Sequence, residues 1–495
     1  MIIKFEEQLY ESLKSFLLGD LSSNERICYL LGHSSTKNGK VVVYPAKILI
    51  PEESSVNATK SSIRVNKDIV GAIYRIFGES DYDVIINCHS HPFDSSENVE
   101  FSFIDDKYDK VEADYIYNEI VKIKSANDLS SNILYSSIVI GQNSINSRWI
   151  ESSNLNKFKN TKRVDVIGKQ FSILHANTEN KKSLLQWSRQ LLTYSKQSQN
   201  TLDKISVAVI GAGGTGSIIA EGLVRLGVTN INIIDDDIVE LTNLNRWQGG
   251  RIKDIGEYKS QALAEKLKNS AENINVFPFT FNAISQDSLD VIKSCDILFS
   301  CVDNAETRFF LNRVSNRYLL PLFDTGVVLS KLKTSQSFAK WQNRLHIPGT
   351  TRCNDCSSIK IYNKEEMCRF FFDKTTLLNM KEQGYIKDEP NEKSPSVYHL
   401  NSFASSLTLY EFHNYLAGFK ELSWFTSGDL NQISNITKAV VEKDLSNFPI
   451  QSLNSSFIED ECKHCVNCNI YKGTGDFWSL NEFFTTESEL SFEQD

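Results

Sequence analysis

A glycine-rich turn between an apolar run and a helix constrains the fold of this chain more than any other feature. The continuous apolar run 205–211 is typical of a strand buried on both faces of a parallel sheet. The turn that follows has the pattern G-x-G-x-x-G, with its glycines at Gly211, Gly213, Gly214 and Gly216. Glycines let the backbone approach a phosphate, and the next helix presents unpaired N–H groups to it. The pattern therefore predicts a nucleotide site in an α/β unit.

The second half of the chain alternates strand and helix patterns around this turn. A helix is predicted at 184–202, and further strands are predicted at 231–235, 296–303 and 320–326. This alternation indicates a Rossmann-like, doubly wound α/β sheet.

The first half carries shorter, β-branched apolar runs separated by turn residues, which indicate an α+β unit. Its predicted elements are a helix at 6–19 and strands at 26–32, 40–50, 83–91, 132–141 and 163–168, the last of which we expect to close the unit. A polar stretch at 175–183 follows. We therefore expect two domains, 1–172 and 173–495.

Composition narrows the class of protein further. A net charge of −9 argues against a general nucleic-acid binder. No apolar run reaches the length of a membrane span, and the acidic N-terminal segment is unlike a signal peptide. Ten cysteines without a secretion signal indicate a reducing, cytoplasmic setting, in which cysteines are more often metal ligands or catalysts than disulfides.

Charged residues after the second and later strands favour ATP over a dinucleotide. A hydride-transfer site has little use for so many charges, whereas ATP needs a ribose carboxylate, cations for its phosphates and an acid for Mg²⁺. The residues concerned are Asp235, Asp237, Asn243, Arg246, Lys259 and Asp303. Two alternatives remain: a dehydrogenase, and a Rossmann unit that binds no nucleotide.

This set resembles the ubiquitin-activating and ThiF/MoeB-like adenylating family. The stretches that carry the resemblance are GAGGTGS (211–217), DDDIVELTNLNR (235–246), the lysine of GEYKSQ and the strand end SCVDN. The resemblance implies that Asp235 binds ribose, that Asn243, Arg246 and Lys259 bind phosphates, and that Asp303 holds Mg²⁺. It also implies that Arg189 reaches ATP, in some relatives from a partner subunit, so that a homodimer through this domain is expected.

Two C-x-x-C pairs, Cys353/Cys356 and Cys465/Cys468, predict a four-thiolate site for a structural Zn²⁺. The adenylating family carries such pairs in these places, and Cys462 is a competing ligand. Cys28, Cys88, Cys295 and Cys301 lie on apolar strands and are interpreted as core packing.

Cys368 lies between the first cysteine pair and a predicted helix at 395–407. Relatives that form a thioester place their nucleophile in this interval. The neighbouring Lys364 and Arg369 favour a thiolate, whereas the run Phe370–Phe372 favours burial. A thioester cysteine and a packing cysteine are therefore both open.

A histidine pair marks the first half. His89 and His91, two apart on an extended segment, can point to one side. With the carboxylate of Asp105 they predict a three-ligand zinc site with one position left for water. The sequence H-S-H-P followed by S-F-I-D resembles the JAMM metalloprotease motif of the JAB/MPN family. The resemblance implies that Glu25 is the general base and that Ser102 stabilises the oxyanion. A degenerate MPN scaffold is the alternative.

Together these motifs predict a bifunctional enzyme of the kind found in bacterial ubiquitin-like conjugation systems, some of them linked to phage defence. The first domain would cleave after the tail of a ubiquitin-like protein. The second would adenylate that tail, with thioester transfer to Cys368 and to a conjugating enzyme. The alternatives are a sulfur-carrier adenylyltransferase with a tail-processing JAB domain, and a scaffold in which both sites are inactive.

Overall fold

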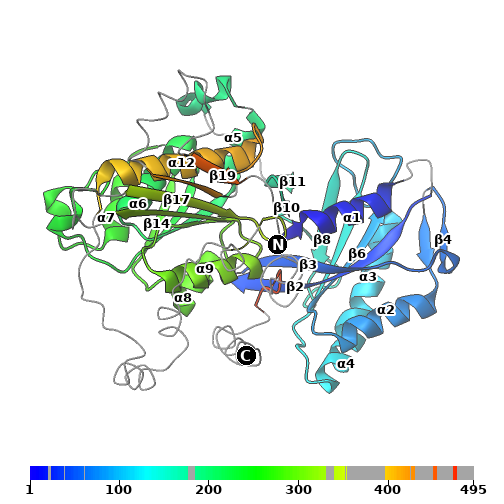
Figure 1. The fold of residues 1–495 in the computed structure, drawn as a ribbon. Helices are drawn as coiled ribbons and strands as arrows, with labels where there is room; N and C mark the ends of the chain where they lie inside the picture. Colours follow the sequence, from blue (N-terminus) through cyan, green and yellow to red (C-terminus); the bar gives the residue numbers. More distant parts are fainter. Residues whose placement is uncertain are drawn as a thin grey trace, which may run out of the picture. The chain divides into compact units, whose positions relative to one another are not determined.

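A computed structural model provides the fold of the chain. It describes residues 1–19, 24–37, 39–60, 62–176, 184–194, 196–271, 273–329, 339–351, 353, 396–423, 425–429, 450–453 and 472–476. The chain divides into two compact units (Figure 1). The first contains Met1–Lys181 and Gly473–Trp478, and the second contains Lys182–Lys472 and Ser479–Asp495.

The first unit is a mixed sheet with helices on both faces. Its described strands run in the order β11-β10-β1-β3-β2-β6-β7-β8-β9, and β4 pairs separately with β5. The elements are β1 (Ile2–Glu6), α1 (Glu7–Leu18), β2 (Ile27–Lys37), β3 (Lys40–Leu49), β4 (Val56–Ala58), β5 (Ile63–Val65), α2 (Lys67–Glu79), β6 (Val84–Ser90), α3 (Phe103–Tyr115), α4 (Val121–Ala126), β7 (Leu134–Ile140), β8 (Ile145–Ile150), β9 (Phe158–Asn160), β10 (Arg163–Ile167) and β11 (Ser172–Ala176).

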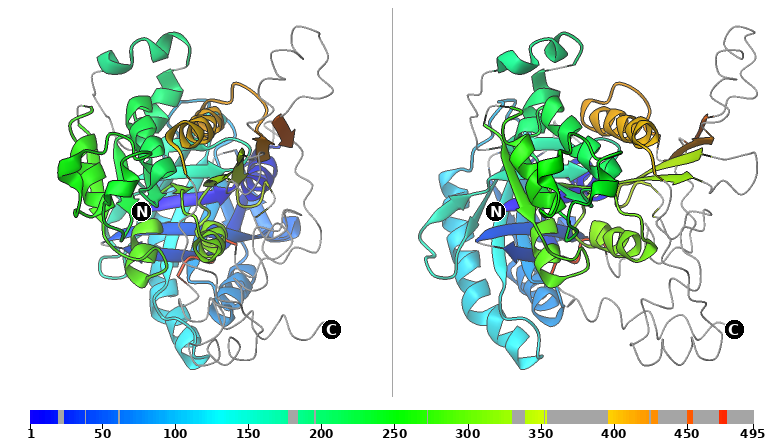
Figure 2. Two further views of the ribbon diagram at one scale, coloured as in Figure 1. Left: turned by 60° about the vertical axis from the view of Figure 1, so that its left-hand side comes forward. Right: turned by 90° about the vertical axis from the view of Figure 1, so that its left-hand side faces the viewer.

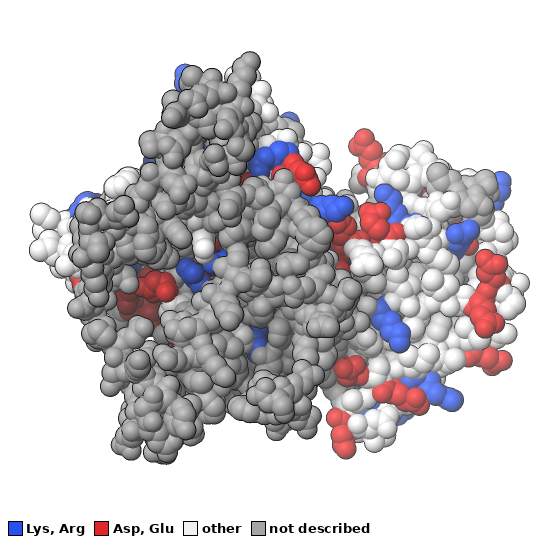
Figure 3. Space-filling view, viewed as in Figure 1, with Lys and Arg blue, Asp and Glu red and all other residues white. Residues whose placement is uncertain are grey.

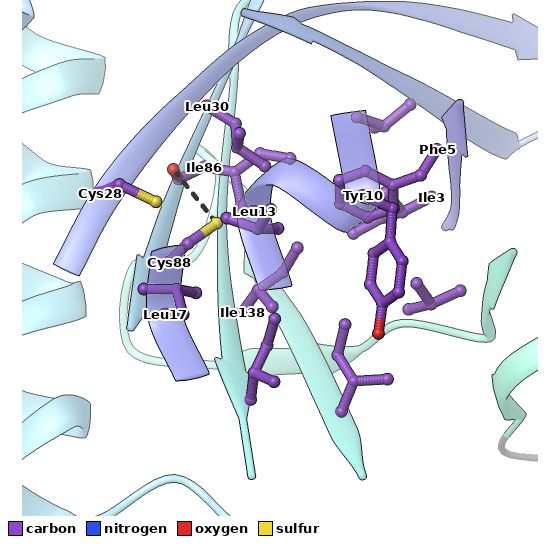
Figure 4. Packing of buried hydrophobic residues seen from close by; sticks show 14 of the residues in the cluster. Ile3, Phe5, Tyr10, Leu13, Leu17, Cys28, Leu30, Ile86, Cys88 and Ile138 are labelled. Atoms are coloured by element: carbon purple, nitrogen blue, oxygen red, sulfur yellow. Dashed lines mark hydrogen bonds between the residues drawn. The ribbon is translucent and has the colours of Figure 1, made fainter. Parts of the chain in front are cut away.

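Alternate residues of each central strand enter two separate cores, as the period of a strand requires. Cys28 and Leu30 of β2 pack with Leu13 and Leu17 of α1 on one face (Figure 4). Tyr29 of the same strand enters the other core, with side chains of α2 and α3. In Figure 1, α1 lies on one side of the strands, and α2 and α4 lie on the other. The first unit is therefore a three-layer structure.

The prediction that four cysteines on apolar strands pack in the core is confirmed. Cys28 and Cys88 are opposite one another on β2 and β6 and are fully buried. The Cys88 thiol lies 3.9 Å from the carbonyl oxygen of Ile86 (Figure 4). Cys295 and Cys301 are also buried.

The prediction that 163–168 closes the first unit is wrong. The strand exists as β10, but β11 follows it and pairs antiparallel with it, so the sheet continues beyond residue 172. The β11 residues are all half-buried, which is why their apolar pattern is weak in the sequence.

On the face of the first unit that Figure 3 shows, acidic and basic side chains are interspersed.

The second unit is built on a Rossmann-like sheet with the described order β14-β13-β12-β15-β16-β17-β18-β19. The first five strands are parallel and the rest are antiparallel. The elements are α5 (Lys196–Lys204), β12 (Ser206–Ile210), α6 (Gly214–Leu226), β13 (Asn230–Ile234), α7 (Lys259–Leu267), β14 (Asn275–Phe279), α8 (Gln286–Ile292), β15 (Ile297–Ser300), α9 (Ala305–Arg317), β16 (Leu322–Leu329), β17 (Ala339–His346), α12 (Tyr398–Ala417), β18 (Phe425–Asp429) and β19 (Ile450–Leu453).

The single helix predicted at 184–202 is wrong. The chain forms short 3₁₀ turns at Leu184–Trp187 and Gln190–Leu192 before α5 begins. The cause is tertiary: the Trp187 indole N–H donates to the carbonyl oxygen of Arg225 and Gln190 donates to that of Leu226, at the C-terminal end of α6. Capping a neighbouring helix outweighs the local helical pattern. Among the helices that the structure describes, none is long and apolar enough to cross a membrane.

Candidate functional sites

Three side chains of metal-ligand type meet at one end of the first unit's sheet. His89 lies near the end of β6, His91 follows it, and Asp105 is in the first turn of α3. The Asp105 carboxylate lies 3.4 Å from the Nε2 atom of His89 and 3.7 Å from that of His91. All three candidate ligand atoms lie within 4.8 Å of one another.

The chemistry of this cluster fits a metal ion. His89 is 5% exposed, and its Nε2 atom has no hydrogen-bond partner among the described residues. A buried ring nitrogen without a partner is costly unless a ligand occupies it. Two imidazoles and one carboxylate are a common donor set for zinc with an open position.

The start of α3 fixes the carboxylate of this cluster. Ser102 is the N-cap residue, and its hydroxyl accepts from the Asp105 N–H at 3.3 Å, while the Asp105 carboxylate accepts from the Ser102 N–H at 2.6 Å. Burial raises the pKa of Asp105, but the His89 side chain and the Ser102 groups outweigh it and hold that pKa below its usual value. Asp105 is therefore an ionised carboxylate that can bind a cation. The Ser102 hydroxyl is engaged in the cap.

Glu25 stands directly before β2 at the edge of the cluster. Its backbone N–H donates to the carbonyl oxygen of Thr59 at 2.9 Å, and its carboxylate lies 4.0 Å from the Nε2 atom of His91. The side chain is buried, and burial raises its pKa to about 7. A carboxylate in this position can accept a proton near neutral pH.

The structure contains a buried ionic network next to this cluster, which the sequence analysis did not predict. Asp109, one turn after Asp105 on α3, accepts from Arg148 at 2.6 Å, Ser137 at 2.6 Å and Tyr135 at 2.8 Å. The i, i+4 spacing of the two acids on one helical face is the signal that would have indicated it. The network anchors α3 to β7 and β8 and so holds Asp105 in place.

Replacing Asp109 with alanine is expected to destabilise the first unit by about 3 kcal/mol, because the Arg148 guanidinium stays buried without its main partner. Hydrogen–deuterium exchange of the β7 and β8 amides in the full-length protein measures this opening free energy. Asp114→Ala, an exposed acid on the same helix, is the control and should change it by less than about 0.5 kcal/mol. Equal exchange in the two variants would show that the network does not stabilise the unit.

In the second unit, the glycine-rich turn joins β12 to α6 as predicted. Gly211 has φ +89°, a conformation that favours glycine. A β-carbon at Gly216 would overlap the carbonyl oxygen of Gly211, so the turn closes on itself. Gly213 is the N-cap of α6, and Gly214 begins the helix.

Asp235, at the end of β13, lies against this turn. Its carboxylate accepts from the N–H of Ala212 at 2.6 Å and from that of Asp237 at 2.8 Å. Burial raises the pKa of Asp235, and the nearby Lys259 acts in the opposite direction. The Lys259 ammonium lies 2.6 Å from the Asp237 carboxylate.

The segment after Asp237 folds back onto the turn. The Asn243 side chain accepts from the N–H of Glu240 at 3.0 Å, and Arg246 donates to the carbonyl oxygen of Thr242 at 2.7 Å. The Trp247 indole N–H donates to the carbonyl oxygen of Ala212 at 2.7 Å. This tryptophan therefore ties the Arg246 segment to the glycine-rich turn.

Asp303 and Arg189 are both exposed. Asp303 follows β15, and Arg308 donates to the carbonyl oxygen of the preceding Val302 at 2.7 Å. Arg189 adjoins Gln190, which binds the C-terminal end of α6. Helix α6 has 13 residues and is about 20 Å long. Arg189 lies near its C-terminal end, whereas the glycine-rich turn lies at its N-terminal end, so the two are far apart in one chain.

The cysteine site falls mostly outside the described residues. Cys353 is described and is buried. Cys356, Cys368, Cys462, Cys465 and Cys468 lie outside the described residues.

Comparisons with known proteins match the second unit. The ThiF family model matches residues 187–421. "Adenylyltransferase and sulfurtransferase MOCS3" of Xenopus laevis is 30% identical over 207 residues, which are 39% of this chain and 44% of that protein. "Ubiquitin-like modifier-activating enzyme 5" of Rattus norvegicus is 30% identical over 163 residues, 31% of this chain and 39% of that protein. The chain thus spans less than half the length of these relatives.

Among solved structures, E. coli MccB in complex with MccA-N7isoASN is similar with a TM-score of 0.44 and 20% identity, over 58% of this chain and 75% of that one. The family match covers the glycine-rich turn, the Asp235 segment and the strand end that carries Asp303. Residues 187–421 are thus similar to ThiF-family adenylation domains.

Proposed function

We propose that the second unit activates the C-terminal carboxylate of a ubiquitin-like protein by ATP-dependent adenylation. The observation that carries the proposal is the gathering of Asp235 and the Arg246 segment around the glycine-rich turn. A carboxylate beside the turn suits a ribose, and the N-terminus of α6 with a nearby guanidinium suits phosphates. The similarity to a ubiquitin-like modifier-activating enzyme supports the same class of substrate.

In this reaction a carboxylate oxygen of the tail attacks the α-phosphorus of ATP. The new C–O–P linkage forms as the bond to pyrophosphate breaks, so negative charge builds on the leaving group. Asn243, Arg246 and Lys259 would stabilise that charge, and Asp303 would hold a Mg²⁺ ion that offsets it. Lys259 is paired with Asp237 in this structure, so it exchanges that partner for a phosphate when ATP binds.

Arg189 serves the site of a second copy in this proposal. Its place near the C-terminal end of α6 separates it from the turn of its own chain. A homodimer through the adenylation domain would bring it to the partner's nucleotide.

We further propose that the adenylated tail passes to Cys368 as a thioester and then to a conjugating enzyme. The thiolate attacks the acyl carbon, and AMP leaves. Cys353, Cys356, Cys465 and Cys468 would hold a structural Zn²⁺ that stabilises the domain.

Cys368→Ala is expected to leave pyrophosphate exchange intact while removing a reductant-sensitive band between the enzyme and its ubiquitin-like protein. The measurement is a non-reducing gel after incubation with ATP and a ubiquitin-like protein. Cys353→Ser is the contrasting variant and should lose metal and weaken both steps. A band that persists in Cys368→Ala would assign the thioester to another cysteine, with Cys462 first.

We propose that the first unit is a JAMM-type zinc peptidase that cleaves after the same tail. His89, His91 and Asp105 would hold the zinc ion, which lowers the pKa of water at its open position when bound. Glu25 would accept a proton from the attacking water and return it to the leaving amine. The Ser102 hydroxyl accepts a hydrogen bond in the cap of α3, and it would donate its own hydrogen to the developing oxyanion.

A sulfur-carrier adenylyltransferase is the second candidate, favoured by the similarity to "Adenylyltransferase and sulfurtransferase MOCS3". In that case the adenylate receives sulfur, and no conjugating enzyme is needed. The wild-type protein would then form no thioester band with its partner, although pyrophosphate exchange would proceed.

A further inference from the structure

Helices α6 and α12 pack side by side (Figures 1 and 2). A β-carbon at Gly214 would overlap the Asn401 amide nitrogen, and one at Gly222 would overlap the side chain of Leu409. Between these points, the Ser405 hydroxyl donates to the carbonyl oxygen of Thr215 at 3.2 Å. Along these contacts the residue numbers increase in the same direction on both helices, so the two helices are parallel. Both N-termini therefore lie at the glycine-rich turn.

This parallel arrangement places two like dipole ends together. Each helix N-terminus carries roughly half a positive charge and several N–H groups without an intrahelical acceptor. An anion near two such ends would be stabilised by both. The α12 N-terminus is also tied to the Arg246 segment, because the Tyr398 hydroxyl donates to the Gln248 side chain at 2.5 Å.

Asn401 supplies the side chain that points to a ligand at this place. It lies in the first turn of α12 and is 3% exposed. Its amide nitrogen donates one hydrogen to the Ser396 hydroxyl at 3.1 Å, and its second amide hydrogen has no acceptor among the residues that the structure describes. The aliphatic stem of Arg246 lies on the same side of Gly214, 3.5 Å from the position of a β-carbon. A buried amide hydrogen beside an anion cradle requires an acceptor.

We propose that Asn401 is a further nucleotide-binding residue, which donates its amide hydrogen to a phosphate oxygen of ATP between the N-termini of α6 and α12. The inference rests on the proposed function, because it takes ATP as the ligand of the second unit. It assigns to α12, far along the chain from the glycine-rich turn, a direct part in holding the polyphosphate. It also explains why position 214 is glycine, since any side chain there would displace the amide.

The test compares MgATP and adenosine binding to the full-length protein by isothermal titration calorimetry, with no protein substrate present. Asn401→Asp keeps the size of the side chain but places a carboxylate beside the phosphates. Asn401→Ala is expected to weaken MgATP binding at least about 10-fold, as for the loss of a hydrogen bond to a charged group, and Asn401→Asp is expected to weaken it further. Adenosine, which has no phosphate, should bind both variants like the wild type.

Asn200→Asp, an exposed position on α5, is the matched charge control and should bind MgATP like the wild type. Unchanged MgATP affinity in both Asn401 variants would overturn the proposal. An equal loss of MgATP and adenosine affinity would also overturn it, because the role of Asn401 would then be structural. If the wild type itself binds no MgATP, the proposed function fails rather than this assignment.

Discussion

Replacing Glu25 with glutamine is expected to leave the metal content of the first unit unchanged while slowing tail cleavage by about 1,000-fold, within the range for loss of a general base. Glutamine has the size of glutamate but takes no proton from water. Glu25 is not among the three converging ligands, so the cluster itself stays intact. The measurements are zinc content by elemental analysis and the rate of cleavage of a ubiquitin-like precursor or conjugate.

His89→Ala is the contrasting variant, because it removes a ligand. It should lose the zinc itself, and with it all cleavage. His33→Ala provides a histidine control on β2, further along the strand than Ile27, which pairs with His89, and should keep its zinc. Normal cleavage by Glu25→Gln would remove Glu25 from the mechanism, and normal zinc content in His89→Ala would remove the metal site.

The local elements of both units could be predicted because their signals are local. The buried strands β6, β12 and β15 lie within the predicted apolar runs, and the glycine-rich turn lies between a strand and a helix as expected. Ser102 and Asp105, three residues apart, meet in the capping box of α3, a contact that the sequence analysis did not specify.

The contacts that the sequence did not reveal join segments far apart in the chain. Arg148 reaches Asp109 from two strands beyond α3, and Asn401 reaches Gly214 from a helix after the cysteine segment. The pattern of either segment alone does not specify its partner. The 3₁₀ turns before α5 were mispredicted for the same reason, since their side chains cap a helix that follows them in the sequence.

Asp303→Ala is expected to reduce ATP–pyrophosphate exchange driven by the ubiquitin-like protein by about 100- to 1,000-fold, the scale for loss of one charge-stabilising group. Asp303 follows the end of β15 and is exposed, with the backbone before it held by Arg308. In the proposed reaction its carboxylate holds the Mg²⁺ that offsets the charge on the leaving pyrophosphate. The alanine variant should therefore need far more Mg²⁺ for half-maximal exchange.

Its matched control is Asp287→Ala, an exposed acid on α8, which should exchange at the wild-type rate. Tail cleavage by the first unit should survive in both variants, because the two reactions use different residues. Wild-type exchange in Asp303→Ala would exclude this carboxylate from the reaction. Loss of cleavage together with exchange would instead indicate that the substitution disrupts folding, and Asp303→Asn, which keeps the size of the side chain, would then separate the charge from the fold.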